Sequence, residues 1–256
     1  MSEVVFSIDG HVARVHLNRP AALNAINAAM NLALRDIWRE VNANPSIWLV
    51  VLTAEGEKAF CVGGDLKEGQ GPSERIGLGG GITGIGGPLL TVTKPVIAGV
   101  QGHVLGGGFE LAMCADIIVA ADTAKFALPE TALGVIGECG VVHRAMRQLP
   151  YRVAMALILT GERLSAGDAL HHGLINQVVP FDAMEAAIAQ WCDRVLAASP
   201  LAVQAAKDAA LSRLNHPLEV ALATRFEKIE HYSSTSDYAE FKSAFLTKST
   251  PRWKGY

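Results

Sequence analysis

The sequence predicts an α/β domain followed by an all-helical region. Two continuous apolar runs of strand length, residues 48–53 and 96–100, suit strands of a sheet that is covered on both faces. Helical sequence follows each of them. Beyond Pro180 the strand-like runs stop and only helical spacing remains. We therefore divide the chain into an α/β core, residues 1–180, which carries the functional motifs, and a helical region, residues 181–256.

The first two elements of the core are a β-hairpin and a helix. Residues 4–8 and 12–17 alternate as strands around Asp9-Gly10, a dipeptide that supplies positive φ to a two-residue turn. Asn27 then suits the N-cap of a helix, because the apolar residues that follow recur at helical spacing.

The remaining elements follow from shorter signals. Residues 117–120 and 175–179 are β-rich and add two strands to the repeated β and α units of the core. A glycine-rich stretch, residues 69–87, is expected to form a loop. Ser-Pro, His-Pro and Ser-Thr breaks divide the end of the chain into four predicted helices, at residues 181–198, 201–214, 218–231 and 237–246.

Composition narrows the class of protein. The chain has 256 residues, 50% of them hydrophobic, and 25 acidic against 22 basic residues, so we expect neither nucleic acid nor a membrane as a partner. The four cysteines lack CxxC spacing, which predicts reduced thiols without disulfides. The N-terminus resembles a strand rather than a signal peptide, and no apolar run approaches about 20 residues. These features predict a cytoplasmic protein.

Two glycine-rich segments could present free main-chain amides. In residues 58–67, two glycines interrupt a strand-like run, so a ligand could approach the backbone closely. In residues 102–111, three glycines lead into a helix with Glu110 in its first turn, and unsatisfied helix N-terminal amides attract negative charge. Two such donors that converge on one point would form an oxyanion hole.

Three glutamates lie in apolar or glycine-rich surroundings. Glu110 belongs to the second glycine segment, Glu130 ends the segment at residues 126–130, and Glu138 stands among glycines. Desolvated carboxylates are candidate acids and bases. The structural alternatives are a helix-dipole contact for Glu110, an ion pair with Lys125 for Glu130 and a solvent-facing turn for Glu138. By themselves these residues name no substrate.

The same segments resemble the signatures of the crotonase superfamily of enoyl-CoA hydratases and isomerases. Residues 59–67, 106–112 and 126–130 look like three motifs of that family, and the likeness runs in order to the terminal Trp253-Lys254-Gly255. The resemblance implies a crotonase-like spiral of β-β-α units with a C-terminal helical trimerisation region. It also implies an acyl-CoA thioester as substrate and assembly as a homotrimer or homohexamer.

The resemblance further implies roles for individual residues. Hydratases of the family build the oxyanion hole from two amides, which fall on Gly64 and Gly107. Their two catalytic glutamates fall on Glu110, the base that deprotonates water, and Glu130, the acid that protonates the α-carbon. Contacts to the substrate CoA fall on Ala59, Val62, Asp65, Leu66, Lys67, Phe245 and Lys248. Coenzyme A is then part of the substrate, and no separate cofactor and no metal are expected.

One departure from the family pattern leaves the reaction open. Glu138 stands where hydratases usually have glycine, and carnitinyl-CoA dehydratases also carry an acid there. Enoyl-CoA hydration is therefore the primary hypothesis, with carnitinyl-CoA dehydration or enoyl-CoA isomerisation as alternatives in which Glu138 takes part in catalysis. A non-enzymatic RNA- or protein-binding family member is the alternative from another class, which the retained glutamates and the negative charge disfavour.

Overall fold

The computed structural model describes residues 2–69, 91–137 and 140–256. Its larger sheet has six strands in the order β1-β2-β3-β5-β7-β10, and all of them run parallel except the first. The strands are β1 (Val4–Asp9), β2 (Val12–Leu17), β3 (Leu49–Ala54), β5 (Val96–Val100), β7 (Ile117–Ala121) and β10 (Gln177–Val179).

A smaller sheet with the order β4-β6-β8-β9 stands beside the larger one. Its strands are β4 (Ala59–Cys61), β6 (His103–Leu105), β8 (Lys125–Ala127) and β9 (Arg163–Ser165), of which only β9 is antiparallel to its neighbour. The chain alternates between the sheets, because β3, β5 and β7 are each followed by a strand of the smaller sheet. This alternation is the predicted spiral of β-β-α units, and it confirms the α/β fold class.

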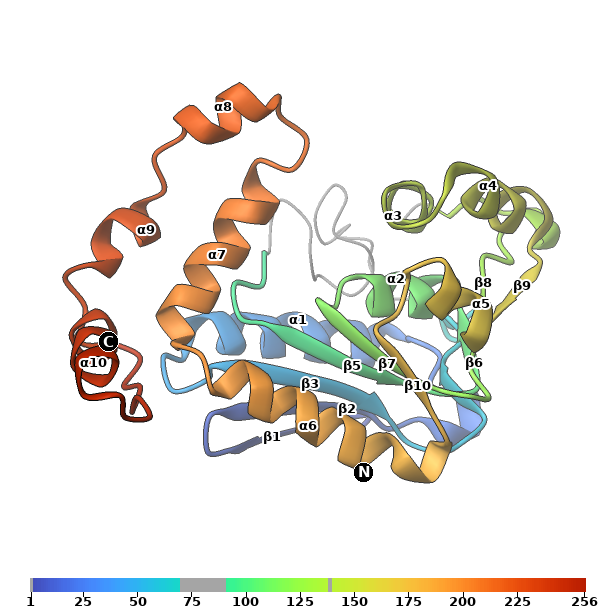
Figure 1. Cartoon of the computed structure of the whole chain (residues 1–256). Helices are drawn as coiled ribbons and strands as arrows, with labels where there is room; N and C mark the ends of the chain where they lie inside the picture. Colours follow the sequence, from blue (N-terminus) through green and yellow to red (C-terminus); the bar gives the residue numbers. More distant parts are fainter. Residues whose placement is uncertain (1, 70–90, 138–139) are drawn as a thin grey trace.

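Ten α-helices are found in the described part of the chain (Figure 1). They are α1 (Ala28–Ala43), α2 (Gly107–Met113), α3 (Val141–Gln148), α4 (Tyr151–Thr160), α5 (Ala166–His171), α6 (Met184–Leu196), α7 (Pro200–Ser212), α8 (Leu218–Ala223), α9 (Glu227–Tyr232) and α10 (Ser236–Thr247). Single 3-10 turns occur at Pro20–Ala22, Thr131–Leu133 and Phe181–Ala183.

Both faces of the large sheet are covered at its centre, which is why β3, β5 and β7 are almost continuously apolar. On one face α1 contributes Met30, Leu34 and Trp38 to the main core, all fully buried. On the other face α6 packs Met184 and Ile188 against β3, β5 and β7. A parallel sheet buried on two faces needs no polar alternation along its strands. Helix α6 therefore lies on the sheet of the core, although it follows residue 180.

The early elements form where their signals predict them. The strands β1 and β2 pair from Val4 with Leu17 to Asp9 with Val12, so the hairpin turn is Gly10-His11, one residue later than Asp9-Gly10. Gly10 has φ +55°, which glycine adopts without steric cost. Asn27 is the N-cap of α1, and its side chain accepts a hydrogen bond from Met30 N (3.0 Å).

One predicted helix is wrong. The stretch at residues 218–231 forms two short helices, α8 and α9, rather than one. Thr224 ends α8 with an extended backbone (ψ 132°), its hydroxyl donates to Val220 O (2.7 Å), and it accepts from Arg213 Nε (3.2 Å). Side-chain hydrogen bonds of this kind compete with continuation of a helix. The helices α7 to α10 consequently form a bent arm that leaves the sheet and returns to it (Figure 1).

The end of the chain is held by Asp237 in the first turn of α10. This carboxylate is fully buried and accepts hydrogen bonds from Ser199 Oγ (2.7 Å), Lys254 N (2.8 Å) and Gly255 N (3.0 Å). Trp253 Nε1 donates to Ala197 O (2.8 Å) beside them. The terminal Trp-Lys-Gly motif therefore connects α10 to the junction between α6 and α7.

Replacing Asp237 with alanine is expected to destabilise the protein by about 3 kcal/mol, because three donors lose a charged acceptor in a buried site. The thermal unfolding midpoint measures this loss. Asp193→Ala, on the exposed side of α6, is the matched control and should stay within about 0.5 kcal/mol of the wild type. Equal midpoints for the two variants would show that the motif is not an anchor.

Candidate active site

Two glycine segments from different β-β-α units meet at the N-terminus of α2. A Cβ on Gly108 would lie 2.2 Å from Cys61 O, so only glycine lets α2 pack against the end of β4. A Cβ on Gly63 would lie 3.0 Å from Gly107 N. The main chain of the first segment therefore touches the main chain of the second, with no side chain between them.

The amides of Gly64 and Gly107 lie at this junction. Gly107 is the first residue of α2, where an amide has no acceptor within its own helix. Gly64 is bracketed by hydrogen bonds from Ile26 N to Gly63 O (2.8 Å) and from Asp65 N to Ile26 O (2.9 Å), which leave its own amide free of an acceptor among the described residues. Both glycines are partly exposed. Two donors are thus available to a ligand from solvent.

Arg19 holds the first glycine segment in place. Its Nη1 donates to Ala25 O (2.6 Å) and to Asp65 Oδ2 (3.0 Å), and its Nη2 donates to Glu68 Oε1 (2.8 Å). Asp65 Oδ1 also accepts from Lys67 N and Glu68 N (2.9 and 3.0 Å). The guanidinium therefore connects the segment at Ala25, which pairs with Gly64 through Ile26, to the segment that follows Gly64 at Asp65 and Glu68. The sequence analysis missed this role, because Arg19 lies 46 positions before Asp65.

Glu110 points into the interior from the first turn of α2. The residue is fully buried, and neither carboxylate oxygen has a hydrogen-bond partner among the described residues. Burial raises the pKa of Glu110 to about 8, although Arg144 lowers it and Glu130 raises it further. The Arg144 Nε lies 3.9 Å from Glu110 Oε1. An unsatisfied buried carboxylate is costly for folding, which is typical of a site kept for chemistry.

Glu130 follows β8 and lies over the second glycine segment. Its Oε1 lies 2.9 Å from the position that a Cβ on Gly106 would occupy, and burial raises its pKa. The structure therefore brings Glu110, Glu130 and the two glycine amides together, as the sequence analysis predicts. Gly137 also approaches Glu130, since its Cβ position lies 3.7 Å from Glu130 Cδ. The next residue, Glu138, lies outside the described residues.

The predicted CoA contacts fall in two separate places. Ala59 is buried in β4, Val62 is half-buried, and Leu66 and Lys67 are exposed, so four of these residues lie close to Gly64 along the chain. The Asp65 carboxylate, in contrast, is engaged by Arg19. Phe245 and Lys248 lie on and after α10, exposed to solvent, and α10 lies beyond the left end of the sheet, well away from α2 (Figure 1). Within one chain the structure does not bring them to the site.

A cavity of about 480 Å³ adjoins Ala59. Leu23, Asn24 and Lys58 are among its lining residues, and Asn24 Nδ2 donates to Ala59 O (2.9 Å). Lys58 is the first residue of the first glycine segment, and the sequence analysis gave it no role of its own. A lysine in this position could have been noticed, because an anionic ligand needs local cations in an acidic chain.

Other kinds of site are not evident in the parts that the structure describes. Over residues 2–69, 91–137 and 140–256 there is no group of three or more His, Cys, Asp or Glu side chains placed to hold a metal ion. Among those residues, none of the helices is long and apolar enough to cross a lipid bilayer. Cys61, Cys114 and Cys192 are free thiols.

The arrangement of two free amides and two desolvated carboxylates defines an enzyme that moves protons beside a polarised carbonyl. Comparison with known proteins agrees, since the family model for enoyl-CoA hydratase/isomerase matches residues 7–256. The chain therefore belongs to the enoyl-CoA hydratase/isomerase family, within the crotonase superfamily.

Individual relatives span the full length of the chain. It is 34% identical to (E)-benzylidenesuccinyl-CoA hydratase of Thauera aromatica, over 98% of this chain and 99% of that protein. It is 36% identical to carnitinyl-CoA dehydratase of Citrobacter koseri, over 100% of both. The structure of a provisionally assigned short chain enoyl-CoA hydratase from Novosphingobium aromaticivorans superposes with a TM-score of 0.92 and 62% identity, over 100% of this chain and 99% of that one.

Glu110→Gln is expected to change how stability depends on pH. The pKa of Glu110 is about 8 in the folded protein against 4.5 ordinarily. The free energy of unfolding of the wild type therefore falls by about 1.4 kcal/mol per pH unit as the pH rises from 4.5 to 8. Glutamine has no such loss. The melting temperature of the variant should therefore exceed that of the wild type increasingly from pH 5 to 8, as thermal scans would show. Glu185→Gln, at an exposed position, is the control. Parallel pH profiles of the melting temperature for the wild type and Glu110→Gln would refute the raised pKa of Glu110.

Proposed function

We propose that this protein catalyses the reversible syn addition of water to a 2-enoyl-CoA thioester. The observation that carries the proposal is the meeting of Glu110 and Glu130 with the free amides of Gly64 and Gly107. The family membership supports CoA-thioester chemistry of the hydratase and dehydratase type. The relatives are named for different acyl groups, so the likeness by itself selects none of them.

In the proposed mechanism the thioester oxygen accepts hydrogen bonds from Gly64 N and Gly107 N, which stabilise the negative charge of an enolate. Glu110 takes a proton from water as the water oxygen bonds to the β-carbon. Glu130 gives a proton to the α-carbon on the same face, and the thioester carbonyl re-forms. One proton leaves water and one enters the product, so the enzyme ends with its proton moved from Glu130 to Glu110.

The electrostatics of the pair suit this exchange. The pKa of Glu110 is raised to about 8 and that of Glu130 is raised as well, in both cases chiefly by burial. Because Glu130 also raises the pKa of Glu110, the two carboxylates favour states in which at least one of them holds a proton. A shared proton lets one residue act as acid while the other acts as base.

CoA is proposed to reach the amides along β4. In this proposal Ala59, Val62, Leu66 and Lys67 contact the CoA, as the family resemblance implies, and the cavity beside Ala59 offers Lys58 as a cation for a phosphate. The side chain of Asp65 serves the backbone turn instead, since its oxygens accept from Arg19, Lys67 and Glu68. No cofactor besides the CoA of the substrate enters the proposed mechanism.

Assembly as a homotrimer or homohexamer is part of the proposal. The arm exposes large apolar side chains, including Leu218 (68%), Leu222 (77%) and Phe245 (74%), which a second copy of the chain would cover. A contact between copies would also give Phe245 and Lys248 a way to reach the CoA of a neighbouring subunit. The free thiols fit the proposed cytoplasmic location.

Glu130→Gln is expected to lower kcat for crotonyl-CoA hydration by about 10²- to 10⁴-fold, because the amide cannot protonate the α-carbon. Affinity for the ester should remain, since glutamine preserves the shape of the side chain. Loss of the conjugated thioester absorbance measures turnover, and calorimetry measures binding. Exposed Glu162→Gln is the control. Wild-type turnover in Glu130→Gln would show that another group is the acid.

The absorbance of the conjugated thioester also tests the alternative reactions of the family. Carnitinyl-CoA dehydration or enoyl-CoA isomerisation would use Glu138. The residue before it in the sequence, Gly137, lies beside Glu130. Fast hydration of crotonyl-CoA by the wild type supports the hydratase. Activity confined to carnitinyl-CoA or to double-bond migration would replace the hydratase with one of the alternatives.

Light scattering of the intact protein should give the mass of three or six chains. The double variant Leu218→Glu/Leu222→Glu is expected to lower that mass, because both leucines lie on one face of α8 and charge opposes their burial. Glu219→Gln on the same helix is the control. A monomeric wild type would refute the proposed assembly without affecting the catalytic assignment.

A further inference from the structure

A large cavity lies between α3 and α7, next to the turn of α2 that follows Glu110. Its volume is about 950 Å³, within the range of small-molecule sites, and its lining includes Met113, Cys114 and Arg144. Cys114 N donates to Glu110 O (3.1 Å), one turn along α2 from the carboxylate. Arg144 connects the two sites, since its Nε lies 3.9 Å from Glu110 Oε1. We call this space the α3–α7 cavity.

Among the described residues that line the α3–α7 cavity, basic side chains outnumber acidic ones. Arg144, Arg147 and Lys207 line it together with His143, against two aspartates. Both aspartates are already engaged, because Asp116 pairs with Lys207 (2.6 Å) and Asp208 pairs with Lys228 from outside the lining (3.4 Å). Arg144 lies 3.9 Å from Glu110 Oε1, which leaves Arg147 as the arginine of the described lining without a carboxylate of the described residues within 4.0 Å.

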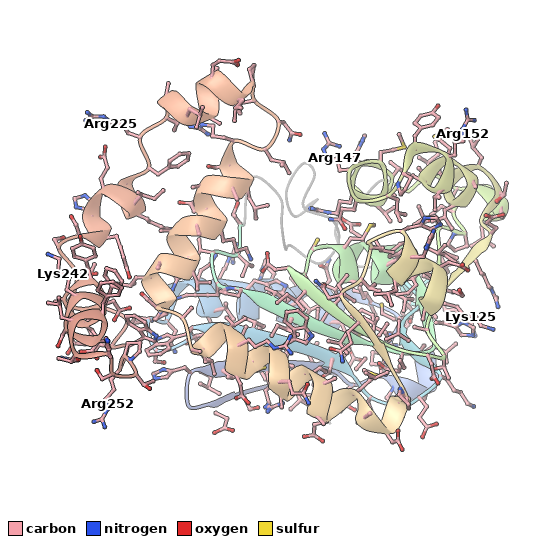
Figure 2. The ribbon with its side chains drawn as sticks, in the orientation of Figure 1. Lys125, Arg147, Arg152, Arg225, Lys242 and Arg252 are labelled. Carbon is pink, nitrogen blue, oxygen red and sulfur yellow. The ribbon has the colours of Figure 1, made fainter. Side chains whose placement is uncertain are left out.

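Arg147 is the cation placed to meet a ligand. It is exposed, its Nη1 donates to His143 O in its own helix (3.0 Å), and no carboxylate of the described residues lies within 4.0 Å. Figure 2 shows its side chain extending from α3 on the side that faces the α7–α8 arm. Arg144 and Arg147 are three residues apart, so they lie on one face of α3, with Arg147 about 5 Å farther along the helix axis.

These groups suit an anion and not a quaternary ammonium ion. A guanidinium binds a carboxylate through two parallel hydrogen bonds. A quaternary ammonium group instead needs aromatic faces or free carboxylates. The described lining of the cavity contains no Phe, Tyr or Trp, and its aspartates are paired.

We propose that the acyl group of the substrate carries a second carboxylate, which enters the α3–α7 cavity and is bound by Arg147. This inference rests on the proposed function and names its substrate class, the 2-enoyl-CoA thioesters of dicarboxylic acids. The β-carbon lies beside Glu110, and the chain continues past Arg144 to its anionic end. Arg147 acts as a specificity residue and takes no part in proton transfer.

The closing experiment compares two esters of equal length, 2-hexenoyl-CoA with a methyl end and 2-hexenedioyl-CoA with a carboxylate end. The kcat/KM of the wild type is expected to be more than about tenfold higher for 2-hexenedioyl-CoA than for 2-hexenoyl-CoA, because only the former makes a charge-assisted bidentate contact. Arg147→Met should remove this preference and leave kcat/KM for 2-hexenoyl-CoA unchanged. Carnitinyl-CoA, which carries a quaternary ammonium group, should be a poor substrate.

The matched control is Arg152→Met on α4, an exposed arginine outside the cavity lining that lies on the far side of α3 from the arm (Figure 2). It should retain the preference of the wild type. A basic residue in the last turn of a helix also complements the helix dipole, but that role would alter stability and leave selectivity unchanged.

The outcomes separate the two proposals. Hydration of 2-hexenoyl-CoA without a preference for the dicarboxylic ester overturns the carboxylate site and leaves the hydratase intact. A preference that survives in Arg147→Met overturns the role of Arg147. Failure to hydrate either ester or crotonyl-CoA overturns the proposed function, and with it the inference built on it.

Discussion

The contact between two stretches of bare main chain, at Gly108 against Cys61 O and at Gly63 against Gly107 N, is the constraint on which the rest of the site depends. A methyl group at Gly108 would lie 2.2 Å from the carbonyl oxygen of Cys61, more than 1 Å closer than the 3.4 Å of an ordinary van der Waals contact. The glycines therefore bring α2 onto the end of β4. Two amides from different β-β-α units then face the same space, and Glu110 is carried into the interior.

Burying Glu110 has an energetic cost that the rest of the fold must offset. A carboxyl group with no hydrogen-bond partner among the described residues, and with a pKa of about 8, opposes folding at neutral and alkaline pH. The large sheet provides the compensating stability, because α1 and α6 cover both of its apolar faces. Arg19 stabilises the turn at Gly63-Gly64, which follows β4, through its hydrogen bonds to Ala25 O and Asp65 Oδ2.

Helix α7 is the first helix of the arm and attaches the arm to the catalytic core. Lys207 fixes it to the core by donating to Asp116 Oδ2 (2.6 Å) and Lys94 O (2.8 Å), and the same lysine lines the α3–α7 cavity. The arm beyond it exposes the apolar side chains of α8 and α10. The wall of the cavity and the proposed surface for subunit contact are thus parts of one continuous helical segment, so assembly and the shape of the cavity are physically connected.

The sequence by itself determined the α/β class, the hairpin, α1, the glycine segments and three candidate glutamates, because these depend on local periodicity, φ preferences and residue type. Only the tertiary structure decided that α6 covers the sheet, that 218–231 breaks into α8 and α9, and that α10 lies far from α2 within one chain. It also revealed Arg19, Arg144 and Arg147. Arg19 and Arg144 have partners tens of residues away, in Asp65 and Glu110, and Arg147 faces the arm only because α3 packs where it does, so none of these relations exists before the chain has packed.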